Sequence, residues 1–118
     1  MVIPIPTTLP KYFRQCLEII RIIPPLNTLR PKELDVLAGL LYEDYKYSHL
    51  APDVRSKIVF DYTTKMELRD RIHIDEQQFN NCLTSLRKKG ILKKRGIETN
   101  YGINPDKPFI TFEFKIKE

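Results

Sequence analysis

Residues 75–95 read DEQQFNNCLTSLRKKGILKKR, and the expected fold class follows mainly from this stretch. Asp75 is a favourable N-cap residue, and Gln78 three positions later completes a capping-box pattern. Apolar residues then recur at i, i+3, i+4 and i+7, which gives one apolar stripe: Phe79, Cys82, Leu83 and Leu86. Gly90 is the expected stop at the C-terminal end of the helix. The stretch predicts an amphipathic helix over residues 76–89.

The face opposite this stripe is polar. At about 100° per residue it carries Gln77, Asn81, Thr84 and Lys88, with Ser85 and Asn80 at its edges. The side-chain amides of Asn and Gln match the donor and acceptor pattern of an adenine edge. The same residue types also cover ordinary surface helices. The face therefore predicts either a surface that reads bases or a solvated surface without a ligand.

Positive charge is concentrated at the end of this helix and just beyond it. Residues 77–97 contain no acidic residue and six basic ones: Arg87, Lys88, Lys89, Lys93, Lys94 and Arg95. The net charge of the whole chain is +5, so the remaining residues together are close to neutral. A local basic cluster of this kind indicates contact with a phosphate backbone or with an acidic protein surface.

The composition is that of one globular domain. The chain has 118 residues, of which 42% are hydrophobic and 30% charged, values that permit a core and argue against a disordered chain. No run approaches the ~18 apolar residues of a membrane span. The first ten residues, MVIPIPTTLP, lack the basic region of a secretion signal. We expect a cytoplasmic protein with no membrane partner.

Catalytic and metal-binding patterns are missing from the sequence. There is no Gly-rich phosphate loop, HExxH motif, nucleophile elbow or carboxylate pair at a useful spacing. Cys16 and Cys82 lie in apolar patterns, which predicts buried thiols rather than a disulfide or a metal pair. His49 has no ligand-type neighbour at metal-binding spacing. Cys82 with His73 would be a nucleophile and base, but Cys82 falls on the core stripe. We expect no enzyme activity, no metal and no cofactor.

The first 27 residues are expected to form a region of their own that contacts a partner. Residues 1–10 have no charged side chain and contain three prolines, which predicts an extended arm. Residues 11–23, KYFRQCLEIIRII, have helical apolar spacing and precede Pro24-Pro25, although the Ile-rich half also suits a strand. The apolar face packs either within the domain or against a second copy. We expect a homodimer or larger assembly through residues 1–23.

Three further helices are expected before residue 75. Pro31 opens the first of them, with core positions at Leu34, Leu37, Ala38, Leu41 and Tyr45. Asp53 caps a short helix that runs to Phe60. Asp61, Thr63 or Thr64 caps another that runs to Ile72, and a short turn joins this helix to the one after Asp75. Arg69, Arg71 and His73 surround the turn, and they either contact phosphates or pair with the carboxylates Glu67, Asp70 and Asp75.

Two strands are expected after Gly90. Residues 91–95 form the first, and residues 109–116 alternate in a way that gives one buried apolar face: Ile110, Phe112, Phe114 and Ile116. We expect these strands to pair, with the polar segment 96–108 as the connecting loop. Lys107 and Lys94 would then flank a groove or the backbone of DNA.

These segments resemble the winged helix-turn-helix superfamily over about residues 28–116. LRPKELDVLAGLLYE at 29–43 is similar to its opening helix, and NNCLTSLRKKGIL at 80–92 is similar to its recognition helix and first strand. YGINPDKPFITFEF at 101–114 resembles the wing and return strand of some plasmid and phage replication proteins. Arg30, where Thr or Ser is common, and the long spacer 47–64 depart from the family pattern. The resemblance implies a mainly α fold with a small β hairpin, a winged helix over 28–118.

The resemblance also implies roles for individual residues. The base-reading positions would be Gln77, Asn81, Thr84, Ser85 and Lys88. The backbone contacts would be Arg87, Lys89, Lys93, Lys94, Arg95 and, in the wing, Lys107. The first hypothesis is a regulatory or replication-associated protein of bacterial or phage type that binds double-stranded DNA. The alternative is a non-enzymatic assembly protein, such as a phage virion component, that binds proteins through the winged helix, because function does not follow from fold.

Overall fold

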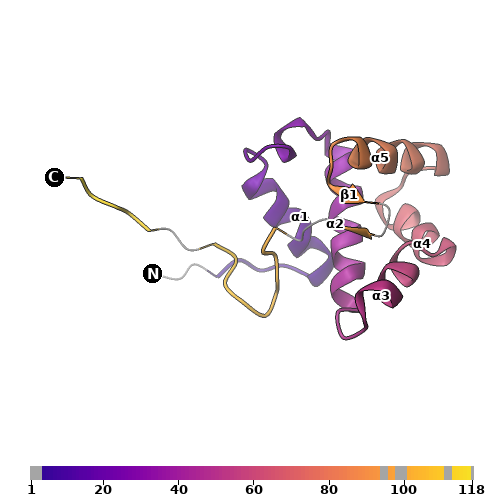
Figure 1. The fold of residues 1–118 in the computed structure, drawn as a ribbon, viewed down its shortest axis with the longest axis horizontal. Coiled ribbons are helices and arrows are strands. Elements are labelled where there is room, and N and C mark those ends of the chain that lie inside the picture. Colours follow the sequence, from indigo (N-terminus) through magenta and orange to yellow (C-terminus); the bar gives the residue numbers. More distant parts are fainter. Residues whose placement is uncertain (1–3, 94–95, 98–100, 111–112, 118) are drawn as a thin grey trace.

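The computed structural model describes residues 4–93, 96–97, 101–110 and 113–117. Within these ranges, a series of α-helices is followed by one small antiparallel hairpin (Figure 1): α1 Leu9–Ile20, α2 Pro31–Lys46, α3 Pro52–Val59, α4 Tyr62–Ile72, α5 Glu76–Lys88, β1 Leu92–Lys93 and β2 Gly96–Ile97. A short 3-10 helix, η1 Leu26–Thr28, connects α1 to α2. The predicted class, mainly α with a small hairpin after the last helix, is confirmed.

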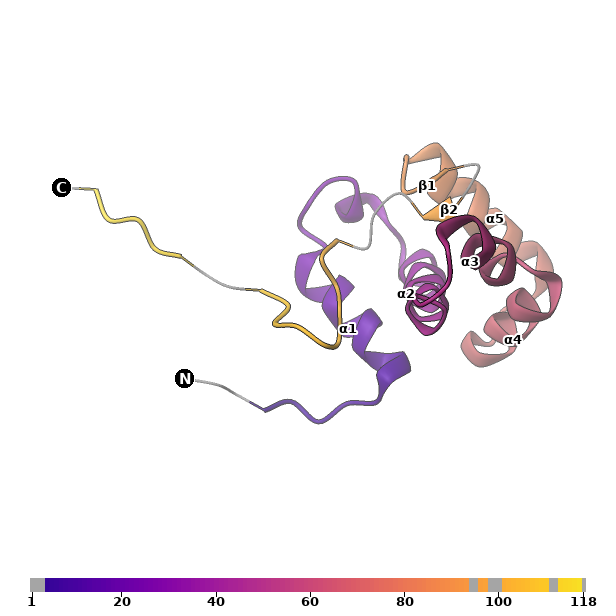
Figure 2. The ribbon, with the colours of Figure 1, turned by 60° about the horizontal axis from the view of Figure 1, so that its bottom comes forward.

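The helix α2 is the one around which the others pack. It lies between α1 on one side and α3, α4 and α5 on the other (Figures 1 and 2). The predicted core positions Leu34, Leu37, Ala38 and Leu41 are buried, and Tyr45 is half-buried. Val36 and Leu40 are also fully buried, although they lie outside the predicted face. A single apolar stripe describes a helix at the edge of a core, whereas α2 is covered on nearly every side.

The close approach of α4 to α2 depends on a glycine. A Cβ atom at Gly39 would lie only 2.1 Å from Cδ1 of Leu68, and Leu68 is fully buried. Near the other end of α2, the buried carboxylate of Glu43 pairs with Arg71 of α4 at 3.6 Å. Asp61 caps α4 by accepting a hydrogen bond from the amide of Thr63. These contacts fix α4 and therefore the short turn into α5.

The helix α1 confirms the helical interpretation of the N-terminal region and corrects its limits. It begins at Leu9 because proline is well tolerated in a first helical turn, so Pro10 belongs to the helix and not to the predicted arm. It ends at Ile20 rather than at Ile23. One side is buried in the same core as α2, and the division of the chain at residue 27 stays a prediction.

The prediction that residues 109–116 form the second strand of the hairpin is wrong. β1 pairs with β2, with Leu92 opposite Ile97 and Lys93 opposite Gly96. Residues 109–110 and 113–117 form no strand, and Phe114 is 89% exposed; the expected strand residues Thr111 and Phe112 lie outside the described residues. Alternation makes a segment suitable for a strand, but a strand also needs a neighbouring edge. Residues 96–97 pair with β1 in place of residues 109–116, which were expected to pair with it.

The segment that was expected to form the wing packs elsewhere. Ile103 is buried, the hydroxyl of Tyr12 on α1 donates to the carbonyl of Asn104 at 3.4 Å, and the hydroxyl of Tyr45 on α2 donates to Asp106 at 3.1 Å. Residues 101–110 therefore run along α1, away from α5 (Figure 2). Residues 101–108 are therefore not a wing beside the basic hairpin.

Candidate nucleic-acid interface

The helix α5 is held by local signals at both ends. The carboxylate of Asp75 accepts from the amide of Gln78 at 2.8 Å, and the side chain of Gln78 accepts in return from the amide of Asp75 at 3.3 Å. Gly90 has a φ of 77°, and the amide of Ile91 donates to the carbonyl of Leu86 at 3.0 Å. This is a Schellman motif, which requires a residue with positive φ at the stop. The predicted cap and the predicted stop are confirmed.

One face of α5 is buried and the opposite face is open to solvent. The predicted core stripe is buried: Phe79, Cys82, Leu83 and Leu86. Burial raises the pKa of the Cys82 thiol, as expected for an inert core cysteine. The side chains of Gln77, Asn81, Thr84 and Lys88 are exposed, as the helical spacing predicted. The open face therefore presents amide, hydroxyl and ammonium groups that form hydrogen bonds.

The edge of α5 that faces α2 is used internally. The hydroxyl of Ser85 donates to the carboxylate of Glu33, and Nζ of Lys89 lies 3.3 Å from Oε2 of the same carboxylate. Lys89 also donates to the carbonyl of Thr28 at 3.0 Å. Ser85 and Lys89, which the winged-helix resemblance assigns to DNA, are thus engaged with α2 and with the turn before it.

The carboxylate of Glu33 is charged in this environment. Its burial would raise the pKa, but hydrogen bonds from Ser85 and from the amide of Arg30, together with Lys89, hold the pKa below the ordinary value. Glu33 occupies the third position of α2 and caps that helix through the Arg30 amide. A single carboxylate therefore joins the start of α2 to the end of α5.

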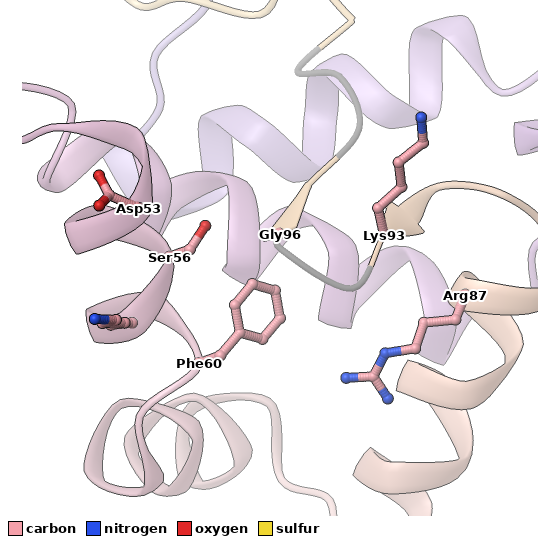
Figure 3. A pocket seen from close by; sticks show the side chains of 7 residues that line it. Asp53, Ser56, Phe60, Arg87, Lys93 and Gly96 are labelled. Carbon is pink, nitrogen blue, oxygen red and sulfur yellow. The ribbon is translucent and has the colours of Figure 1, made fainter.

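The other edge of α5 faces α3 and the hairpin. Arg87 is exposed there, together with Lys93 of β1, and both line a pocket of about 410 Å³ with Phe60 of α3 and Gly96 of β2 (Figure 3). Arg87 and Lys93 were predicted as backbone contacts, and the structure brings them to one side of the C-terminal end of α5. Lys94 and Arg95, predicted for the same role, lie outside the described residues.

Lys107 is not part of this surface. Its backbone amide donates to the carbonyl of Asn104, and that segment lies against Tyr12 and Tyr45. The structure therefore places Lys107 beside α1 rather than beside β1. The expected position of Lys107 beside the hairpin is wrong, and Lys94, its expected counterpart across a groove, lies outside the described residues.

The sequence analysis missed basic residues that are remote in the chain. Arg30 and Lys32 at the start of α2 line a groove of about 790 Å³ with Gln78, Asn81 and Lys89 of α5. Their charges extend the basic surface to the α2 side of the helix. No local pattern marks them, because their position beside α5 follows from how α2 and α5 pack.

The opposite end of α5 is acidic. Asp75 and Glu76 are exposed, and Glu76 lies 3.7 Å from Arg69 of α4. Arg71 pairs with Glu43 and lies over the ring of Tyr42. Both arginines near the turn therefore pair with carboxylates, but with Glu76 and Glu43 rather than with the expected Glu67, Asp70 and Asp75. The surface is therefore graded from acidic at the start of α5 to basic at its end, and a polyanion is favoured at the basic end.

The described part of the chain has no group of three or more His, Cys, Asp or Glu side chains placed to hold a metal ion. Nor does any of its helices reach the length and apolar character needed to cross a membrane. Comparison of the chain with protein-family models, curated proteins and solved structures gives no match.

Proposed function

We propose that this chain is a small winged helix-turn-helix protein that binds double-stranded DNA through α5 and the hairpin. The observation that carries the proposal is the open face of α5, where Gln77, Asn81 and Thr84 lie next to exposed Arg87 and Lys88. The first three offer the groups that read base edges, and the two cations suit phosphates. In the proposed fold α4, the turn at residues 73–75 and α5 form the helix-turn-helix, and β1–β2 is a short wing.

The charge gradient along α5 gives the proposed complex an orientation. The C-terminal end of α5 and β1 face the phosphate backbone, because Arg87, Lys88 and Lys93 gather there. The N-terminal end, with exposed Asp75 and Glu76, points away from the nearest phosphates, since like charges repel. Arg30 and Lys32 line the protein groove between α2 and α5. In the proposed complex they extend the contact to the second DNA strand, across the DNA groove that α5 enters.

A titration of the purified chain with a blunt duplex of random sequence tests this function. If about five phosphates are neutralised, the plot of log affinity against log salt concentration has a slope of roughly −4 to −5. The affinity is measured by fluorescence anisotropy at several salt concentrations. Affinity below detection at low salt, or affinity that does not change with salt, would contradict duplex binding.

A second candidate function is a non-enzymatic assembly role, and a specific observation favours it. Ile19, Ile22 and Ile23 are exposed on and just after α1, at 58%, 81% and 47%, and they face away from the core that the same helix covers. Exposed apolar side chains in a cluster favour contact with another protein surface. In this alternative the winged helix is a scaffold, and residues 1–23 join copies of the chain or attach it to a larger particle.

A further inference from the structure

The pocket between α3, the hairpin and the end of α5 is lined by an aromatic side chain and by charged side chains. It has a volume of about 410 Å³ and is lined by Asp53, Ser56, Lys57, Phe60, Arg87, Lys93 and Gly96. Figure 3 shows the ring of Phe60 and the guanidinium of Arg87 reaching into the space from opposite sides. An aromatic ring and a guanidinium thus line the same open pocket.

A close backbone contact sets the shape of this pocket. Gly96, the first residue of β2, has a φ of 136°, and a Cβ atom there would lie 2.5 Å from Oγ of Ser56. β2 therefore starts directly against α3, which only glycine permits. Phe60 follows at the end of α3, where its amide donates to the carbonyl of Ser56 at 3.0 Å. The hairpin and Phe60 both lie next to Ser56 and line the same pocket.

The chemistry of the walls favours a flat, uncharged ring over a phosphate as the occupant. The ring of Phe60 offers an apolar surface that suits an uncharged ring and not a phosphate, whereas the cations on the walls favour an anion and Asp53 opposes one. A nucleobase stacks on an aromatic ring and on a guanidinium plane, and it carries no charge. Lys93 and Lys57 line the same pocket and suit the phosphate to which that base is attached.

We propose that this pocket receives one unpaired nucleobase of a DNA strand that continues from the duplex held by α5. The inference rests on the proposed function, because α5 must first place the duplex end near β1. Phe60 stacks on the base, and Arg87 at the opposite side of the pocket keeps its place beside the phosphates. The chain then recognises a junction between duplex and single strand in addition to duplex alone.

The test compares three DNA ligands that share one duplex. The first is blunt, the second has a single-nucleotide overhang, at either the 5′ or the 3′ end, and the third has the same overhang with an abasic nucleotide. The abasic overhang keeps the phosphate and removes the base. Since one stacked base contributes about 5- to 150-fold in affinity, the normal overhang is expected to bind tighter than both other ligands by that factor. Phe60→Leu removes the ring, keeps an apolar side chain, and is expected to abolish the gain while leaving the affinity for blunt duplex unchanged.

The matched protein control is Phe109→Leu. Phe109 is a half-buried aromatic residue in the segment that runs along α1, away from α5, so this variant is expected to keep the full gain. Equal affinity of the wild-type chain for blunt, normal and abasic ligands would overturn the pocket assignment and leave the proposed function intact. A chain that binds none of the three lacks the proposed function, and the pocket assignment fails with it.

A free nucleotide shares the chemistry of the unpaired base. Deoxyadenosine monophosphate is therefore titrated as a separate arm, and its affinity is expected to be far below that of the overhang duplex because α5 contributes nothing to its binding. Binding of the free nucleotide as tight as that of the overhang duplex, and lost in Phe60→Leu, would overturn the DNA assignment in favour of a mononucleotide site.

Discussion

Nζ of Lys89, at the C-cap of α5, lies 3.3 Å from Oε2 of Glu33 in the first turn of α2. Ser85, one turn earlier on α5, donates to the same carboxylate. The edge of α5 that carries both side chains is thereby turned toward α2. Asn81 and Gln77, about 40° and about 80° around the helix from Ser85, are exposed to solvent. The proposed DNA-binding face depends on this contact although Glu33 is not part of it.

The ionised form of Glu33 is expected to stabilise the fold in a pH-dependent manner. Because its pKa is lower in the folded chain than in the unfolded chain, its contribution is complete above the ordinary glutamate pKa of about 4.3 and is lost as the pH falls through the folded value. Glu33→Gln is expected to lower the free energy of unfolding by about 1.5–3 kcal/mol at neutral pH and to reduce its dependence on acid. Urea denaturation at pH 7 and across the acidic range measures both effects.

The control for this experiment is Glu67→Gln, which removes an exposed carboxylate of α4. It is expected to change the free energy of unfolding by less than about 0.5 kcal/mol. If Glu33→Gln and the wild type lose stability in parallel as the pH falls, the lowered pKa of Glu33 does not contribute to folding as described.

Gly39 is expected to be required because α4 packs directly on it. Gly39→Ala places a methyl group where Cδ1 of Leu68 lies, and overpacking of this kind costs about 1–3 kcal/mol. In a Leu68→Ala background the added methyl group finds space, so the same substitution is expected to cost much less. Thermal denaturation of the four proteins in this double-mutant cycle gives the coupling. If Gly39→Ala lowers the stability equally in the wild-type and the Leu68→Ala chains, the contact between residues 39 and 68 is not the cause of the loss.

The exposed isoleucines of the α1 region are expected to hold two copies together. Ile22→Asp introduces a charge at a side chain that is 81% exposed, so it is expected to leave the fold intact and to convert a dimer into a monomer. Light scattering during size-exclusion chromatography measures the mass. Val54→Asp, an exposed apolar position on α3, is the matched control and is expected to remain dimeric. A wild-type chain that stays monomeric at high concentration contradicts this prediction.

What the sequence predicted well was encoded locally. Asp75, Gln78 and Gly90 define the ends of α5 by contacts within a few residues, and both ends agree with the structure. Its buried stripe follows from helical spacing alone. The same local reasoning found the start of α2 at Pro31 and named Asp61 among three possible caps of α4, whereas Asp53, predicted to cap the preceding helix, lies inside α3.

What the sequence did not predict depends on partners that are distant in the chain. Ser85 looked like an outward polar residue, but its partner Glu33 is 52 residues away. The alternating residues 109–116 looked like a strand, but its expected edge is occupied by Gly96–Ile97. Lys107 was placed beside the hairpin for the same reason. Spacing assigns a residue to a face or to an element, whereas the packing of elements decides what that face meets.

Asn81 is expected to contribute to the choice of DNA sequence. It lies at the centre of the open face of α5, and its amide suits adenine. Sequences selected by the wild-type chain from a random duplex pool are expected to share a preferred base at one position. Asn81→Ala is expected to weaken that preference by about 1–3 kcal/mol while retaining most of the non-specific affinity. Pools that are equally random after selection would show that α5 does not read bases.

The most direct test of DNA binding by α5 and β1 is the salt dependence of a charge-deleted variant. Arg87→Ala, Lys88→Ala and Lys93→Ala are combined in one chain, and a second chain carries Lys11→Ala, Lys115→Ala and Lys117→Ala, three exposed lysines away from α5. The anisotropy titration with blunt duplex is repeated for both. The first variant is expected to bind much more weakly, with a salt slope shallower by about 3, while the second keeps the wild-type affinity and slope. Equal behaviour of the two variants would contradict the assignment of DNA binding to this surface.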